Sequence, residues 1–316
     1  MGKWRIDKEG TEWDNKGATR GRGKSKGRGN LPQTAMNKKK IRLIAILSVV
    51  CVMGAAVGGY FGTVRRSIAP YHPVDLGEKD LPSPVPATED GYVQLSDVNM
   101  HYVRYGTGAQ PVILIHGNGG NTDSLKELAG YLGRDYSVYC TDSRCQGLSS
   151  DPGEITYDLM AKDIREFMDA KLTAKPYVLG HSDGGIVALS LASLYPDSIA
   201  ACVSCGANSH PDRFKWYFTL GVRVNNLFRP DKLNDLMLTL PDFTPEYLAR
   251  ITVPTYVVAG EYDIMPLSDT VYIHEHIAGS RVAIVKGAGH SSYITRHGGR
   301  IYGIARDFFA EMDQRA

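Results

Sequence analysis

The sequence predicts an α/β domain in which a mostly parallel, doubly wound sheet carries helices on both faces and a short helical cap. One N-terminal transmembrane helix is predicted to precede this domain. Apolar runs of strand length recur through residues 91–316, and turn residues and a helical stretch follow most of them. An aromatic-rich segment at about 206–250 interrupts that rhythm, and an uncharged stretch of 22 residues comes before the domain. These three observations define the fold class.

The N-terminal segment 1–42 is strongly basic and differs in charge from the rest of the chain. It has thirteen Lys/Arg and four Asp/Glu, a net charge of +9, whereas residues 43–316 have 23 and 30, a net charge of −7. Its stretch 20–29 contains no apolar residue, so we expect a disordered tail on the cytoplasmic side. Attraction to anionic lipid head groups is the favoured role. A weak contact of Arg-Gly type with nucleic acid stays open, and so does a role limited to setting the orientation of the chain in the membrane. We expect no specific nucleic-acid partner.

Residues 43–64 form the predicted membrane span. At about 1.5 Å per residue, 22 uncharged residues cross a hydrocarbon core of about 30 Å. Four Lys/Arg lie within 38–42, and only Arg65 and Arg66 follow closely, which predicts a cytoplasmic N-terminus and an extracytoplasmic domain in the cell membrane. A cleaved signal peptide is the alternative, although the basic region is long and a clear A-x-A site is missing. A buried soluble helix is disfavoured because the segment is apolar on every face.

Three glycines of the predicted span lie four residues apart. Gly54, Gly58 and Gly62 share one helix face and permit close helix–helix approach. We therefore expect a weak homodimer, with the alternative that small residues are simply common in membrane helices.

The segments after the span follow in a regular order. Residues 65–90 contain five prolines and are predicted to form an extended linker. The runs 92–95 and 100–105 then alternate in polarity around a short turn, as a hairpin does. The predicted buried strands are Val112–Ile115, Ser137–Cys140, Tyr177–Leu179, Ala200–Val203, Thr255–Ala259 and Val282–Val285. The predicted helices are at about 122–133, 154–171, 184–195, 267–277 and 292–313. An antiparallel start followed by strand–helix units favours a mostly parallel sheet.

The cap is predicted at about 206–250 because this segment lacks a clear strand and is rich in aromatic residues. Trp216, Phe218 and Phe228 are its candidate substrate contacts.

Four cysteines follow the predicted span. An extracytoplasmic location would permit disulfides, so the redox state of Cys140, Cys145, Cys202 and Cys205 stays open. A zinc site is disfavoured because both pairs lie at the ends of strand-like runs.

The candidate nucleophile is Ser182. It lies in Gly180-His-Ser-Asp-Gly184, between a predicted strand and a predicted helix. Small residues at both ends of this pentapeptide permit a strained turn that lifts the hydroxyl clear of the backbone. Between a strand and a helix the pattern is specific, and an ordinary glycine turn is the disfavoured alternative.

A serine nucleophile needs a base and an acid that orients this base, and both are predicted further along the chain. Asp263 follows the strand Thr255–Ala259 and His290 follows the strand Val282–Val285, so both come to the carboxyl edge of the sheet with Ser182. Glu261 and Asp269 are rival acids.

The backbone N–H groups of Asn118 and Asp183 are the candidate oxyanion-hole donors. Asn118 follows the strand Val112–Ile115, and Asp183 follows the nucleophile. His116 is predicted to brace the loop that carries Asn118.

These motifs make residues 92–309 similar to the α/β-hydrolase superfamily of serine esterases and related hydrolases. The motifs are HGNGG at 116–120, DSRCQGLS at 142–149, GHSDGG at 180–185, VPTYVVAGEYD at 253–263 and GAGH at 287–290. Two residues depart from the family's pattern. Cys145 stands where the family often has glycine, and Asp183 stands where many relatives have an apolar residue. A carboxylate there would disfavour anionic acyl groups unless it is paired or points away.

The resemblance implies a serine hydrolase that cleaves a small ester, thioester, amide or lipid-like molecule through an acyl-enzyme on Ser182, without a cofactor or metal. A neutral or cationic substrate is expected. An acyltransferase or carbon–carbon bond hydrolase with the same Ser182, Asp263 and His290 stays open. So does a non-catalytic binding protein on the same fold.

Overall fold

The computed structural model describes residues 71, 73–75, 81–295 and 298–315. The basic segment 1–42 and the predicted span 43–64 lie outside the described residues. Among the residues that are described, no helix combines the length and the apolar character that crossing a bilayer requires.

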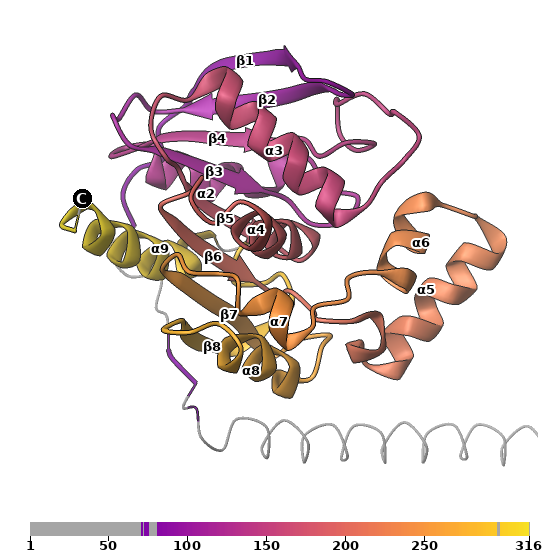
Figure 1. Ribbon diagram of the computed structural model, residues 1–316. Helices are drawn as coiled ribbons and strands as arrows, with labels where there is room; N and C mark the ends of the chain where they lie inside the picture. Colours follow the sequence, from indigo (N-terminus) through magenta and orange to yellow (C-terminus); the bar gives the residue numbers. More distant parts are fainter. Residues whose placement is uncertain (1–70, 72, 76–80, 296–297, 316) are drawn as a thin grey trace, which may run out of the picture. The chain divides into compact units, whose positions relative to one another are not determined.

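One sheet of eight strands forms the centre of the domain (Figure 1). The strands are β1 (Ala87–Gln94), β2 (Asn99–Tyr105), β3 (Pro111–Ile115), β4 (Ser137–Thr141), β5 (Tyr177–His181), β6 (Ala201–Cys205), β7 (Thr255–Tyr262) and β8 (Arg281–Gly289). Their order across the sheet is β1-β2-β4-β3-β5-β6-β7-β8. The β1–β2 and β2–β4 pairs are antiparallel, and every pair from β3–β4 to β7–β8 is parallel. The predicted hairpin and mostly parallel sheet are thereby confirmed, and the carboxyl ends of β5, β7 and β8 lie at one edge.

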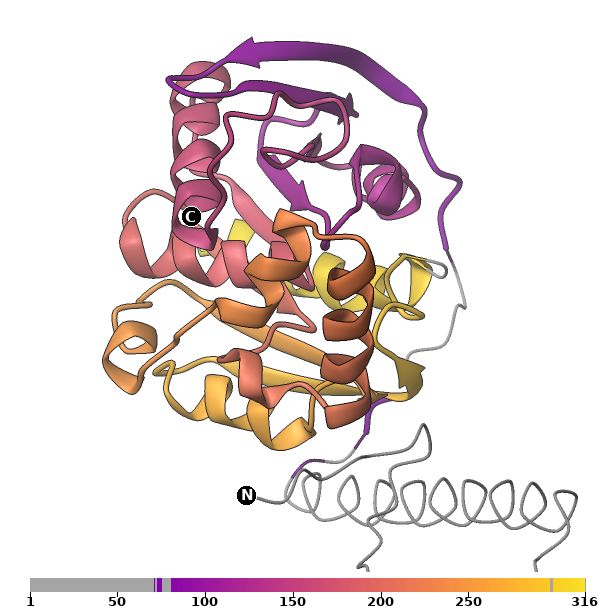
Figure 2. The ribbon, with the colours of Figure 1, turned by 90° about the vertical axis from the view of Figure 1, so that its right-hand side faces the viewer.

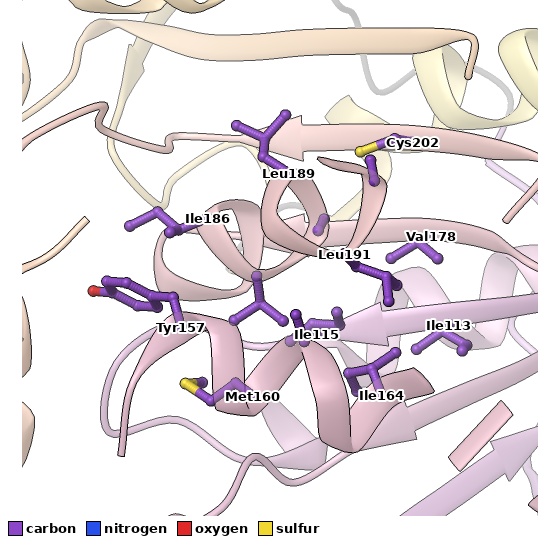
Figure 3. Packing of buried hydrophobic residues seen from close by; sticks show 14 of the residues in the cluster. Ile113, Ile115, Tyr157, Met160, Ile164, Val178, Ile186, Leu189, Leu191 and Cys202 are labelled. Atoms are coloured by element: carbon purple, nitrogen blue, oxygen red, sulfur yellow. The ribbon is translucent and has the colours of Figure 1, made fainter. Parts of the chain in front are cut away.

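Helices cover both faces of this sheet because successive residues of its strands point to opposite sides. Ile113 and Ile115 pack toward α3 (Tyr157–Lys171), α4 (Asp183–Leu194) and α8 (Leu267–Glu275). Figure 3 shows part of this core. Val112 and Leu114 pack on the opposite face, toward α2 (Lys126–Leu132) and α9 (Gly298–Asp313). A 3-10 turn, η1 (Thr122–Leu125), leads into α2. A strand buried on both faces reads as a continuous apolar run, which is why these strands were predictable.

Two predicted segments differ from the structure. The last helix begins at Gly298 rather than near residue 292, because residues 291–295 form the turns that follow His290. Part of the predicted linker 65–90 lies against the domain instead of spacing it. Within that linker, Val74 pairs with Val285 at the free edge of β8, and Leu81 packs in the core beneath α9. Strand β1 also begins there, at Ala87.

The segment between β6 and β7 is helical (Figures 1 and 2). It consists of η2 (Pro211–Arg213), α5 (Trp216–Phe228), α6 (Lys232–Thr239) and α7 (Pro245–Leu248). In Figure 1 its helices α5 and α6 stand apart from the sheet, whereas α7 lies beside it. Helix α5 contacts α6, and α6 contacts η2, while α7 packs on α4. Four helical elements thus lie in the segment predicted as a cap at about 206–250.

Candidate active site

Ser182 lies at a sharp turn between β5 and α4. Its φ of +55° and ψ of −119° are strained for a residue with a side chain. Glycine is needed on both sides of it. A Cβ atom on Gly180 would lie 1.9 Å from the Gly184 carbonyl oxygen, and one on Gly184 would lie 2.1 Å from the Ile115 carbonyl oxygen. The two glycines therefore let the strand and the helix approach closely enough to hold the serine hydroxyl above the turn.

Ser182, His290 and Asp263 form a continuous hydrogen-bonded line. The His290 Nε2 atom lies 2.9 Å from Ser182 Oγ, and the His290 Nδ1 atom lies 2.7 Å from Asp263 Oδ1. Asp263 follows β7, and His290 follows β8. The rival acids take other partners: Glu261 accepts from the Gly287 N–H and Asp269 from Ser209. The structure thus brings together the three residues singled out in the sequence.

His290 and Asp263 each stabilise the charged form of the other. Burial lowers the pKa of His290, but the charge and hydrogen bond of Asp263 outweigh it and raise that pKa above 6.5. Burial raises the pKa of Asp263, but His290 and the N–H groups of Gly260 and Ile264 together lower it below 3.8. Asp263 is therefore ionised near neutral pH. Its hydrogen bond to Nδ1 leaves Nε2 of neutral His290 free to accept the Ser182 proton.

Asn118 and Asp183, the predicted oxyanion-hole residues, lie close to the turn that carries Ser182. Asp183 is the first residue of α4, where backbone N–H groups have no partner within the helix. Asn118 follows Gly117, which approaches the turn so closely that a Cβ atom there would lie 3.0 Å from Ser182 Cβ. Asn118 and Ser182 line the same cavity, so the N–H groups of Asn118 and Asp183 stay the predicted donors to an attacked carbonyl oxygen.

The side chain of Asp183 is buried and paired. Its carboxylate accepts from Asn118 Nδ2 at 2.9 Å and from the Tyr157 hydroxyl at 3.0 Å. Burial raises the pKa of Asp183 to about 6 against these hydrogen bonds, which favour the charged form. The expectation that Asp183 disfavours anionic acyl groups applied to an unpaired carboxylate. Because this carboxylate is paired, that expectation no longer holds. Tyr157 was not anticipated in the sequence, since only the packing of α3 on α4 brings it to Asp183.

A cavity of about 330 Å³ opens above Ser182. Its lining residues are Gly117, Asn118, Gly120, Ser124, His181, Ser182, Phe214, Phe218, Met237, Ile264, His290, Ser291 and Thr295. Of the three predicted cap contacts, Phe218 lines this cavity. Trp216 and Phe228 do not, because they lie on the outer side of α5 with 61% and 78% of their surface exposed. Phe214, which precedes α5, also lines the cavity, and its ring lies 4.9 Å from that of Phe218. Because Phe214 lies outside the helix, no helical spacing in the sequence identifies this pair.

Two further groups hold the site in place. His116 accepts from the Ser143 N–H through Nε2 at 3.0 Å and lies 2.7 Å from the Gly117 carbonyl through Nδ1, so it braces the loop that carries Asn118. Lys215, at the start of the cap helix, donates from Nζ to the Asp263 carbonyl, and its N–H donates to the Ile264 carbonyl. Burial lowers the pKa of Lys215 to about 8. The cap is thereby tied to the loop that carries Asp263.

The four described cysteines are free thiols. Cys140, Cys202 and Cys205 are buried in the strands, and burial raises their pKa values. Cys145 has a φ of +63°, a backbone conformation that glycine adopts more readily. This backbone conformation explains the glycine of the family's pattern, and Cys145 adopts it in spite of its side chain.

Comparison with known proteins agrees with this architecture. Residues 110–229 match the family model described as alpha/beta hydrolase fold. The chain is 29% identical over 247 residues to serine hydrolase BPHL of Homo sapiens, covering 68% of this chain and 84% of that protein. It is 27% identical over 226 residues to lipase 3 of Moraxella sp. (57% of this chain, 71% of that protein). A thermophilic esterase from Thermogutta terrifontis superposes with a TM-score of 0.59 at 21% identity, covering 71% of this chain and 99% of that structure. The chain is therefore similar in sequence to known serine hydrolases and a lipase, and it shares the fold of the solved esterase.

Proposed function

We propose that this chain is a serine hydrolase that cleaves a carboxylic ester, or a related thioester, amide or lipid-like substrate, through an acyl-enzyme. The observation that carries the proposal is the hydrogen-bonded line from Ser182 Oγ through His290 to Asp263 at the base of a cavity. That order of nucleophile, base and orienting acid is what acyl transfer by serine requires.

In the proposed reaction, Ser182 Oγ attacks the substrate carbonyl carbon while His290 Nε2 accepts the hydroxyl proton. The N–H groups of Asn118 and Asp183 then stabilise the oxyanion of the tetrahedral intermediate. The imidazolium, stabilised by Asp263, returns the proton to the leaving group as the acyl–oxygen bond breaks. A water molecule attacks the acyl-enzyme in the same way, with His290 as base, and releases the acid and free Ser182.

The cavity lining favours a small, uncharged and partly apolar acyl group. Phe214, Phe218, Met237 and Ile264 supply an apolar wall. Among the described residues, the lining contains no Asp, Glu, Lys or Arg. A volume of about 330 Å³ is at the lower end of the range for ligand sites. Short and medium acyl chains therefore suit it better than long ones.

The test is hydrolysis of nitrophenyl esters of increasing acyl length, with a matched thioester and amide, by the full chain. We expect the highest kcat/KM for short acyl esters and no enzyme-dependent hydrolysis by the Ser182→Ala variant. Equal turnover by Ser182→Ala and the unchanged chain would contradict the proposal.

We also propose that residues 43–64 anchor the chain in the cell membrane with the hydrolase domain on the extracytoplasmic side. The support for this is the length of the uncharged segment and the excess of basic residues before it.

A further inference from the structure

Helix α5 presents a large apolar surface to solvent. Of its thirteen residues, all of which the structure describes, only Val222 is buried, whereas α3 buries seven of its fifteen. Its exposed large apolar residues are Trp216, Tyr217, Leu220, Val224, Leu227 and Phe228, named here the α5 ridge. Single exposed apolar side chains are ordinary. Yet the described part of the chain has ten exposed large apolar residues, and six of them lie on this one helix. Such a concentration indicates a contact surface.

The ridge follows the helical period. Trp216, Leu220, Val224 and Leu227 are spaced by four, four and three residues and so form one stripe. Phe218 and Val222 face inward, and Phe218 lines the cavity above Ser182. Helix α5 is therefore apolar on its outer face as well as its inner one. A helix of this length is marginal without packing, so contact along the ridge would stabilise it.

The charged residues of the stretch that carries the ridge are positive, and the nearest carboxylates along the chain are those of Asp212, Asp231 and Asp235. The Asp235 carboxylate accepts a hydrogen bond from Asn226 of α5 at 2.7 Å. Residues 213–229 contain four Lys/Arg and no Asp or Glu, although residues 43–316 as a whole have a net charge of −7. Arg223 and Arg229 are exposed beside the ridge. Two copies of the chain facing each other through α5 would bring these charges together unfavourably. An anionic surface would complement them.

We infer that the α5 ridge docks on a lipid bilayer that contains anionic lipids. Apolar side chains with Trp and Tyr on one face and arginines beside them are the features of a helix that lies in the membrane interface. In this arrangement the ridge enters the boundary between head groups and acyl chains, and Arg223 and Arg229 lie near the phosphates. The cavity wall formed by Phe218 lies on the other side of the same helix, so docking brings the cavity within reach of apolar molecules dissolved in the bilayer.

Trp216 provides a direct probe of this contact. The chain has three tryptophans, and the other two, Trp4 and Trp13, lie in the basic segment 1–42. In a full chain carrying Trp4→Phe and Trp13→Phe, all tryptophan emission comes from Trp216. The measurement is its emission maximum and its quenching by brominated acyl chains, in vesicles of equal parts phosphatidylcholine and phosphatidylglycerol. Because the signal comes from α5 itself, it reports docking whether or not residues 43–64 hold the chain to the vesicle.

We expect a blue-shifted emission and strong quenching by the brominated lipid, with both weakened in pure phosphatidylcholine and by added salt. Leu227→Asp, at a residue 77% exposed, should abolish most of the quenching because it places a charge in the apolar interface. Tyr92→Asp is the matched control, since it adds the same charge at an exposed aromatic residue on the edge strand β1. It should leave the quenching unchanged.

Three outcomes would overturn the inference. The first is a Trp216 emission that stays at the position of a solvent-exposed indole and is not quenched. The second is equal quenching in the Leu227→Asp and unchanged chains. The third is a blue shift that depends on protein concentration and not on lipid, which would assign the ridge to a contact between copies of the chain. Hydrolysis of a short soluble ester by each variant shows that the fold is retained, and separates failure of this inference from failure of the proposed reaction.

Discussion

Replacing Asp183 by Asn should change how the stability of the domain depends on pH. Asp183 is 2% exposed and accepts from Asn118 and from the Tyr157 hydroxyl. An Asn side chain can keep both contacts, because its oxygen accepts from Asn118 and its N–H donates to the Tyr157 oxygen. The substitution therefore removes the titration while preserving the shape of the site.

The magnitude follows from the pKa of Asp183. Burial raises it from 3.8 to about 6, so the folded protein binds this proton more tightly than the unfolded chain does. Stability gained from this group is fully present below pH 3.8 and is lost as the pH rises through 6. The whole difference corresponds to about 3 kcal/mol, of which about 1.4 kcal/mol falls between pH 5 and pH 7.5.

Urea unfolding of the full chain in mild detergent, at pH 5 and at pH 7.5, gives the free energy of unfolding at each pH. Asp183→Asn should gain about 1.4 kcal/mol relative to the unchanged chain over this interval. Other carboxyl groups contribute equally to both proteins and cancel in the comparison. The same pH dependence in both proteins would refute the assignment of a raised pKa to Asp183.

Four further predictions concern catalysis, the core and the membrane segment. Because His290 must be neutral to act as base and Asp263 raises its pKa, kcat/KM should rise with pH to a midpoint above 6.5, and Asp263→Asn should lower that midpoint as well as kcat. Asp163→Asn should cost about 3–5 kcal/mol of stability in urea unfolding, since it breaks a buried bidentate pair in which both N–O distances to Arg144 are 2.6 Å. Protease added to spheroplasts should digest the domain and leave a fragment of about 65 residues. This fragment includes the segment 43–64, which at about 1.5 Å per residue is long enough to span the membrane. Release of a protein that begins near residue 60 would contradict the anchor. Gly58→Ile should weaken self-association in a membrane reporter, and an unchanged signal would exclude this helix face as an interface.

The sequence was informative wherever local rules determine the structure. Apolar runs identified the strands, because strands buried on both faces must be apolar throughout. Ser182, Asp263 and His290 could be grouped because each follows a parallel strand, and the carboxyl ends of parallel strands meet at one edge.

Features that depend on the packing of distant segments were not predictable. Tyr157 reaches Asp183 only because α3 packs on α4. The inner face of the cap was misassigned at Trp216 and Phe228, because α5 is apolar on both faces and no sequence period distinguishes them. The edge contact of Val74 arose within a segment whose prolines predicted only an extended chain.

Active-site labelling tests the central claim most directly. The full chain is treated with a fluorophosphonate probe, and the modified residue is located by mass spectrometry. The geometry of Ser182, His290 and Asp263 predicts one label per chain, on Ser182, with none in Ser182→Ala and strongly slowed labelling in His290→Ala. Labelling of a different serine, or undiminished labelling of Ser182→Ala, would contradict the proposed mechanism and leave only the fold.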